Sequence, residues 1–341
     1  MTIYERYQDM AALRGISGCE DQVREYILGA VEGFCESAET DPMGNLIVHK
    51  KGLHPTAHKV LLSAHMDEVG FIITYIEDSD MLRFSAVGGI LPPVTAGRMV
   101  EVGPNRIPGV IGCKPIHVLT PEEKEKYTPL SEMLIDIGAS SNEEAAKMVT
   151  PGDQATFMGS CTDLGEDCFC GRAADDRAGC AMLIELIRRP LPYDCTFVFS
   201  VQEETGCAGA KAAAFSQRPE IAIAVECTSA SDLAGVPGHK TVCALNKGPV
   251  ISFMDKGTIY DRQLYRDACA AADKAGIPWQ TKELVAGGNE SRSYQAGAAG
   301  AKVLAVSTPT RYIHSASCVA SKKDLEDGAK LLEVLIETFG G

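Results

Sequence analysis

Four uninterrupted apolar runs constrain the fold of this 341-residue chain more than any other feature. They cover residues 60–64, 196–201, 221–225 and 302–306. Apolar runs without alternation are typical of strands that are buried on both faces of a sheet. Patterns with helical periodicity occupy residues 21–34, 178–188, 208–215, 261–275 and 324–339. Strands that alternate with helices in this way predict an α/β sheet domain.

The stretch from about residue 70 to 165 has a different pattern. Strand-like segments at 71–76 and 98–102 are separated by glycine and proline pairs, and one clear helix is predicted near 142–148. We therefore expect a small β-rich unit that is inserted into the α/β domain and makes that domain discontinuous. Near the amino terminus, Ser17 and Glu20 have the spacing of a capping box, which predicts a helix start there.

Acidic and imidazole side chains follow the apolar runs, at the point where each predicted strand ends. Ligands of open α/β sheets bind outside the carboxyl ends of the strands, so these side chains are expected to converge. An acid at the start of a helix joins them. Imidazoles and carboxylates together suit a divalent metal such as zinc, cobalt or manganese. The candidate ligands are His65, Asp175, Glu204, Glu226 and His314.

The charge of the candidate ligands favours two metal ions over one. Three crowded carboxylates carry a charge of about −3 and would repel one another without a cation. Two divalent ions and a bridging hydroxide balance that charge, with one carboxylate between the ions. Such a pair of ions acidifies a shared water and holds a reacting oxygen.

The positions of two further acids, Glu203 and Asp67, suggest a function for each. If Glu204 binds a metal, its neighbour Glu203 is free to act as a general base toward the water. Asp67 lies two residues from His65 and could accept its imidazole N–H, which would fix the ring.

Each of these residues also has a simpler interpretation. A single histidine is usually structural, and a Glu–Glu pair is usually solvated. Asp175 and Asp176 could simply complement a helix dipole. The metal hypothesis therefore depends on the joint pattern.

Composition narrows the function classes. There are 32 Lys and Arg residues against 46 Asp and Glu, a net charge of −14, which argues against nucleic-acid or anionic-membrane binding. The sequence contains no apolar run of about 18 residues, the length that would predict a membrane span. The 13 cysteines are an odd number in a long chain without an apolar leader-like segment, so we expect reduced thiols and a cytoplasmic location.

Several motifs in order along the whole chain resemble the tetrahedral aminopeptidases, metallopeptidase family 42, whose members are often labelled glutamyl aminopeptidase or endoglucanase M-like. The matching motifs are residues 17–20, 41–45, 64–71, 109–117, 135–139, 174–179, 202–206 and 311–315.

The resemblance implies a two-metal aminopeptidase that removes amino-terminal residues from short peptides. Asp175 would bridge the ions, with His65 and Glu226 on one and Glu204 and His314 on the other. Glu203 matches the family's general base, and Asp67 matches the carboxylate behind the histidine.

The resemblance also implies a domain organisation. A catalytic three-layer, mixed-sheet α/β domain would comprise residues 1–68 and 164–341, and residues 69–163 would form a PDZ-like dimerisation barrel. Such subunits typically assemble as dimers into a dodecamer. Where the family usually has Asp and Thr-Asp, this chain has Glu226 and Asn289-Glu290, so its metal choice and substrate fit could differ.

Three alternatives stay open at this point. A deacylase of N-acyl amino acids could use the same metals. A glycoside hydrolase could use two carboxylates, but it would leave the histidines without a purpose. A non-catalytic metal-binding assembly protein would bind metal without hydrolysing peptides.

Overall fold

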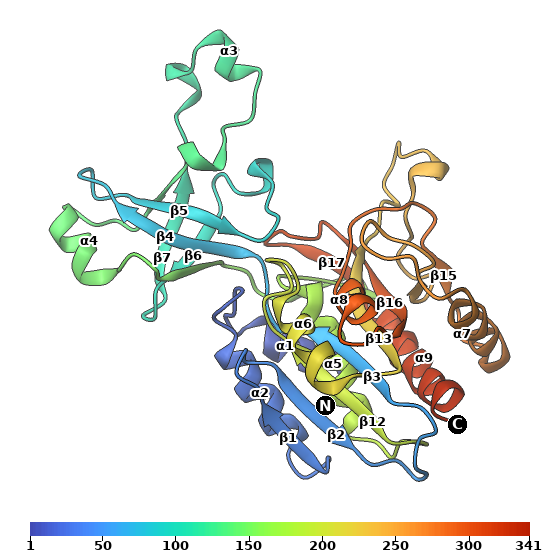
Figure 1. Ribbon diagram of the computed structural model, residues 1–341. Coiled ribbons are helices and arrows are strands. Elements are labelled where there is room, and N and C mark those ends of the chain that lie inside the picture. Colours follow the sequence, from blue (N-terminus) through green and yellow to red (C-terminus); the bar gives the residue numbers. More distant parts are fainter.

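The computed structural model describes all residues 1–341 and contains two β structures, an 11-stranded mixed sheet and a closed six-stranded barrel (Figure 1). Helices cover both faces of the sheet. The predicted α/β sheet with an inserted β-rich barrel is therefore confirmed.

Four neighbouring parallel strands form the centre of the sheet. They are β12 (Cys195–Ser200), β3 (Val60–His65), β13 (Ile221–Ser229) and β16 (Lys302–Arg311), in that spatial order. Because they are parallel, their carboxyl ends meet at one edge, where α/β sheets bind ligands. The other strands are β1 (Ser37–Thr40), β2 (Leu46–Lys50), β10 (Thr162–Leu164), β11 (Cys168–Gly171), β14 (Val250–Ile251), β15 (Gln280–Thr281) and β17 (Cys318–Ser321).

Two separate apolar cores show that the sheet is the middle of three layers. The larger core packs α1 (Ile3–Ala11), α2 (Asp21–Val31), α5 (Ala174–Ile187), α7 (Arg262–Ala275) and α9 (Lys322–Gly340) against one face. The smaller core packs α6 (Ala208–Gln217) and α8 (Ser291–Ala296) against the other. None of the helices has the length and apolar character needed to cross a membrane.

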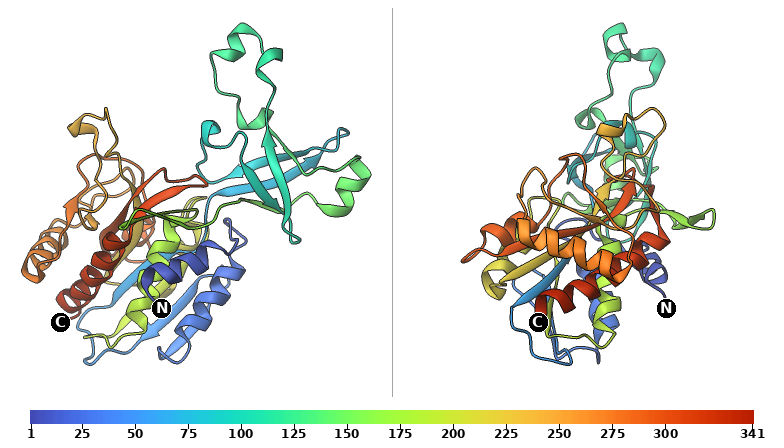
Figure 2. Two further views of the ribbon diagram at one scale, coloured as in Figure 1. Left: turned by 180° about the vertical axis from the view of Figure 1, so that it is seen from behind. Right: turned by 90° about the vertical axis from the view of Figure 1, so that its right-hand side faces the viewer.

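The barrel has its own apolar core, in which Phe71 packs edge-on against Phe84 and Phe157 with ring centroids 4.9 and 5.1 Å apart. Its strands are β4 (Gly70–Ile76), β5 (Leu82–Val87), β6 (Met99–Val102), β7 (Ile107–Gly112), β8 (Leu134–Asp136) and β9 (Gln154–Phe157). Helix α4 (Asn142–Met148) follows β8, and an arm that includes α3 (Pro121–Lys124) connects β7 to β8. All three ribbon views show the barrel and this arm projecting from the α/β layers (Figures 1 and 2).

The structure differs from the sequence-based expectations in two local features. Helix α1 was not predicted. The capping box was wrong, because α2 begins at Asp21 without a side-chain cap. The Ser17 hydroxyl instead donates to Asp67 at 2.6 Å, and the Glu20 carboxylate accepts from the backbone N–H groups of Gly18 and Gln202. Tertiary partners therefore replace the local cap.

Candidate metal centre

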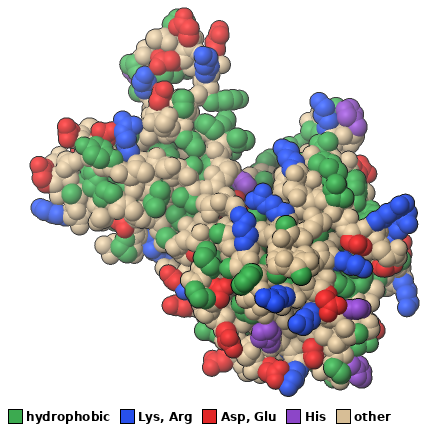
Figure 3. All heavy atoms as spheres, viewed as in Figure 1, with side chains coloured by type: hydrophobic (Ala, Val, Ile, Leu, Met, Phe, Trp, Pro, Cys, Tyr) green, Lys and Arg blue, Asp and Glu red, His purple; other side chains and the backbone are tan.

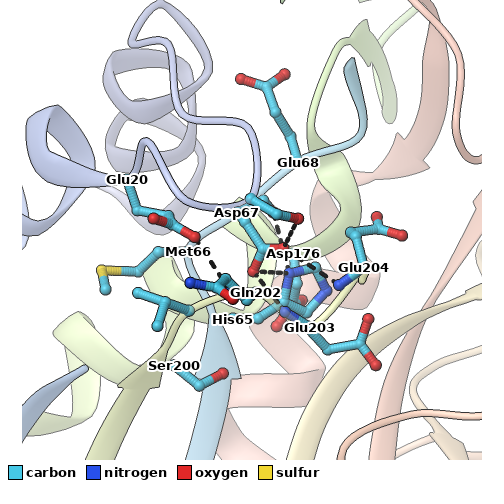
Figure 4. Close-up of polar contacts among 12 residues, drawn as sticks. Glu20, His65, Met66, Asp67, Glu68, Asp176, Ser200, Gln202, Glu203 and Glu204 are labelled. Carbon is cyan, nitrogen blue, oxygen red and sulfur yellow. Dashed lines mark hydrogen bonds and ion pairs between the residues drawn. The ribbon is translucent and has the colours of Figure 1, made fainter. Parts of the chain in front are cut away.

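The predicted site residues meet at the carboxyl edge of the parallel strands. Figure 4 shows four of them, His65, Asp67, Glu203 and Glu204. His65 is the last residue of β3, and Glu203 and Glu204 lie in the turn after β12. Glu226 lies inside β13, which continues three residues further because it pairs with β16 as far as Ser229. Asp175 is in the first, non-helical turn of α5, and His314 lies in the loop between β16 and β17.

The carboxylate of Asp175 lies between the two imidazoles. Its Oδ1 is 3.4 Å from Nε2 of His65, and its Oδ2 is 3.2 Å from Nε2 of His314. Glu226 approaches the His65 nitrogen to 3.7 Å, and Glu204 approaches the His314 nitrogen to 3.2 Å. The structure thus brings all five candidate ligands together around Asp175, whose carboxylate lies next to both imidazoles.

The donor atoms fit divalent cations in spacing and in chemistry. Two ligands of a tetrahedral zinc ion at 2.0–2.2 Å are about 3.4 Å from each other, close to the separations above. Asp175 Oδ1 and Glu204 Oε1 are buried and accept no hydrogen bond. Buried polar atoms of this kind need a partner, and a cation supplies one. Ligand atoms of His65, Asp175 and Glu204 all lie within 4.8 Å of one another.

Electrostatics make this edge attractive to positive charge. Burial lowers the pKa of His65, but the carboxylates of Asp175, Asp67 and Glu226 outweigh it and hold that pKa well above its usual value. At His314, burial likewise lowers the pKa, yet Asp175 and Glu204 raise it to about 11.

Asp67 connects the histidine to the turn after β12. The His65 Nδ1 is 3.0 Å from the Asp67 backbone carbonyl, while the Asp67 carboxylate is 3.5 Å away. That carboxylate accepts from the backbone N–H groups of Glu203 at 3.0 Å and Glu204 at 3.1 Å, and from the Ser17 hydroxyl at 2.6 Å. Asp67 therefore orients His65 mainly through its main chain and fixes the two glutamates through its side chain.

Glu203 lines the cavity above this centre but belongs to none of the close ligand groups. Burial, aided by the charge of Glu204 and opposed by His65, raises the pKa of Glu203 to about 7. The thiol of Cys207 donates to its Oε1 at 3.1 Å. A carboxylate with a pKa near neutrality is suited to exchange protons with a substrate.

Two buried acids were not assigned as ligand candidates from the sequence. Asp176 groups with His65 and Glu226 within 4.8 Å, and burial raises its pKa well above the usual value. Glu290 accepts from the Ser200 hydroxyl at 2.5 Å, and burial raises its pKa to about 7. Each of these acids had one signal in the sequence. Asp176 is next to Asp175, and Glu290 stands where the resembled family usually has the shorter Asp.

The side chain of Arg177 holds the surroundings of the centre in place. The fully buried Arg177 donates to the carbonyls of Met66 and Met10 at 2.7 Å and of Gly15 at 3.2 Å, and it pairs with Glu68. These bonds tie α1 and the segment after β3 to α5.

The barrel also reaches the centre. The carbonyl oxygen of Gly89 lies 2.9 Å from Nδ1 of His314. The preceding Gly88 has φ +83°, and a Cβ there would lie 2.7 Å from Val69. Only glycine therefore fits this approach of the barrel to the histidine.

Comparison with known proteins assigns the chain to a family. A model of the M42 glutamyl aminopeptidase family matches residues 44–331. The chain belongs to this family. As an M42 member it is an aminopeptidase, a hydrolase of peptide bonds, and its cofactors are divalent metal ions. The comparisons do not favour the deacylase, glycoside hydrolase or non-catalytic alternatives.

Relatives in the M42 family match over nearly their whole length. The lysyl aminopeptidase of Pyrococcus furiosus is 32% identical, with 99% of this chain and 97% of that protein covered. An aminopeptidase structure from Desulfurococcus kamchatkensis has a TM-score of 0.93 at 32% identity and covers 98% and 94%. The TET1 peptidase of Pyrococcus horikoshii has a TM-score of 0.86 at 36% identity and covers 98% and 99%. That peptidase assembles into a tetrahedron or a large octahedral shell.

Proposed function

We propose that this aminopeptidase uses two divalent cations per subunit. The observation that carries the proposal is the position of Asp175, which presents one carboxylate oxygen to each imidazole. Asp175, Glu226 and His65 would hold one ion, and Asp175, Glu204 and His314 the other. Zinc or cobalt suits this set of nitrogen and oxygen ligands, with manganese as the third candidate.

The residues around the ligands have separate tasks. When bound, the two cations would polarise the scissile carbonyl and acidify a water molecule. Glu203 would take a proton from the attacking water and return it to the departing amine, which its raised pKa permits. Asp67 would hold His65 and the Glu203–Glu204 turn in fixed positions relative to each other.

Metal analysis and an aminoacyl-anilide panel test this proposal together. The chelated protein is reloaded with zinc, cobalt or manganese in turn, and metal content and turnover are measured. We expect two ions per subunit and turnover that returns with metal. Glu203→Gln should bind the same two ions but lose about 100-fold or more in kcat, because the amide cannot accept the proton. Undiminished turnover of Glu203→Gln at full occupancy would exclude this role.

We also propose that residues 69–163 form the dimerisation module and residues 1–68 with 164–341 the catalytic domain. In Figure 3 hydrophobic side chains are spread over the barrel. On its arm, Ile116 is 73% and Tyr127 75% exposed, so both side chains are available for contact with another subunit. A structure of the TET1 relative is a dodecamer, and that peptidase can also form a large octahedral shell, which supports assembly of this chain into a dodecamer; dimers are its proposed building blocks.

The remaining part of the proposal concerns substrate and location. The cavity of about 430 Å³ accommodates the first residues of a peptide, so short peptides in the cytoplasm are the proposed substrates. An acidic chain with unpaired cysteines is consistent with that compartment.

A further inference from the structure

The loop that carries His314 is anchored on the barrel at two points. The carbonyl oxygen of Gly89 lies 2.9 Å from Nδ1 of His314. Two residues further along the loop, the buried side chain of Ala316 belongs to the apolar core of the barrel. Gly159 packs so closely against the Ala316 carbonyl that a Cβ there would lie 3.0 Å from its oxygen. A loop of the α/β domain therefore contributes one side chain to the core of the barrel.

The backbone of this loop needs support from its surroundings. Tyr312 has φ +57° and His314 has φ +59°, in the left-handed region that is uncommon for residues other than glycine. Conformations of this kind are unfavourable and persist only where neighbouring contacts hold them. Because His314 is a proposed ligand, the barrel contacts hold a ligand in a conformation that the loop alone would disfavour.

The same part of the barrel also lies against Glu204, the ligand that is proposed to share an ion with His314. A Cβ on Gly88 would lie 3.2 Å from the Cβ of Glu204. By contrast, His65 and Glu226, which are proposed to hold the other ion, belong to β3 and β13 in the centre of the sheet. A shift of the barrel would therefore displace ligands of one ion and leave those of the other in place.

A contact on another turn of the barrel holds the barrel against the α/β domain. Arg14, in the segment between α1 and α2, is 3% exposed, and its guanidinium donates to the carbonyls of Gly103 and Pro104. These carbonyls belong to the turn between β6 and β7. Burial and the charge of Arg106 lower the pKa of Arg14, and no carboxylate forms an ion pair with it. A buried guanidinium without an ion pair is costly, which indicates that its bonds to the barrel serve a purpose.

We propose that Arg14 is a positioning residue for one of the two ions. It holds the barrel against the α/β domain, so that Gly89 and Ala316 keep His314 in place. His314 and Glu204 then bind their ion tightly. The inference rests on the proposed two-ion centre. The competing explanation is that Arg14 only stabilises the fold, in which case its loss affects both ions alike or neither.

Calorimetric titration of the chelated protein with cobalt tests this role on each ion separately. His314→Ala should leave the ion at His65, and His65→Ala should leave the ion at His314. In the His65→Ala background, Arg14→Met should weaken cobalt binding about 10- to 100-fold, the range for groups that support metal ligands. In the His314→Ala background, Arg14→Met should change cobalt affinity less than about twofold, because independent sites do not couple.

Further variants show whether the effect belongs to the contact with the barrel. Ala316→Gly removes the side chain that enters the barrel core and should weaken the same ion, which also gives the comparison if Arg14→Met does not fold. Arg83→Met is the matched control, because this exposed arginine of β5 pairs with Glu77 inside the barrel, and it should leave both affinities unchanged. At saturating cobalt, Arg14→Met should hydrolyse leucyl anilide at close to the parent rate, which a damaged fold would not allow.

Three results would overturn the positioning role. They are an Arg14→Met effect of equal size on both ions, an effect on neither, and an effect on the ion at His65 alone. Failure of the two-ion proposal looks different, because the parent protein would then take up one cobalt ion per subunit. The affinity of that single ion should still fall in Arg14→Met, and it should fall no further when Arg14→Met is added to His314→Ala; a further fall would overturn the role.

Discussion

Replacement of Asp67 by Asn removes one charge with almost no change in shape. The carboxylate uses Oδ1 for the Glu203 N–H and Oδ2 for both the Glu204 N–H and the Ser17 hydroxyl. An Asn side chain can place its oxygen on only one of these two sides. In either orientation, its NH₂ group then faces a backbone N–H that has no other acceptor there.

The loss of these hydrogen bonds sets the expected size of the effect on metal binding and catalysis. Loss of one hydrogen bond to a charged acceptor is worth about 1.5–3 kcal/mol, or about 10- to 150-fold. The displaced turn carries a proposed ligand and the proposed base, so metal affinity should also fall about 10- to 100-fold, as for other groups that support metal ligands. We therefore expect Asp67→Asn to lower both metal affinity and kcat/KM.

Chelator competition measures the metal affinity, and anilide hydrolysis at saturating metal measures kcat/KM. Ser17→Ala is the matched control, because it removes one donor and leaves both backbone bonds, at a cost of about 1 kcal/mol. Asp67→Asn protein that stays within twofold of the parent in both measurements would refute the reasoning. A lower melting temperature alone would show that Asp67 is only structural.

Three other predictions concern stability, pH and assembly. Arg177→Met should lower the free energy of unfolding by about 3–5 kcal/mol in urea titrations, because the buried carbonyls of Met66, Met10 and Gly15 lose their donor, although Glu68 keeps its pair with Arg172. The exposed Arg189→Met should cost under about 1 kcal/mol, and equal effects would contradict this. Burial raises the pKa of Glu203 to about 7 from 4.5, so its contribution to the stability of chelated protein is lost as pH rises through that range. Bound cations would favour the ionised form of Glu203 and would compete with the protons on His65 and His314, so the melting-temperature difference between metal-loaded and chelated protein should grow from pH 5 to pH 8. A constant difference would argue against it. Ile116→Asp should reduce the assembled mass in light scattering while the isolated subunit stays folded. An unchanged mass would show that the arm is not part of the interface between subunits.

The α/β layers could be predicted because their pattern is local. Strands β3 and β12 are apolar on both faces, and their runs mark them in the sequence. Helix α9 is equally clear from its periodic apolar side. By contrast, the extension of β13 beyond Glu226 depends on pairing with β16, which leaves no trace in the residues themselves.

The sequence was enough to predict the residues of the candidate site but not the hydrogen bonds among them. Strand-end positions were enough to select His65 and Glu204. They could not show that Asp67 supports His65 through a carbonyl and Glu203 through a carboxylate, since that division depends on how two turns face each other. Asp176 was missed for a similar reason, because its burial comes from packing and not from its helix-start position.

The contact between Gly89 and His314 has a consequence for how subunits would influence one another. The tilt of this imidazole is set by a main-chain oxygen that belongs to the barrel. If neighbouring subunits dock through the barrel, docking would also act on a ring of the candidate metal centre. A separated subunit could then be correctly folded and yet slow, so that enzyme dilution would lower specific activity before any unfolding begins.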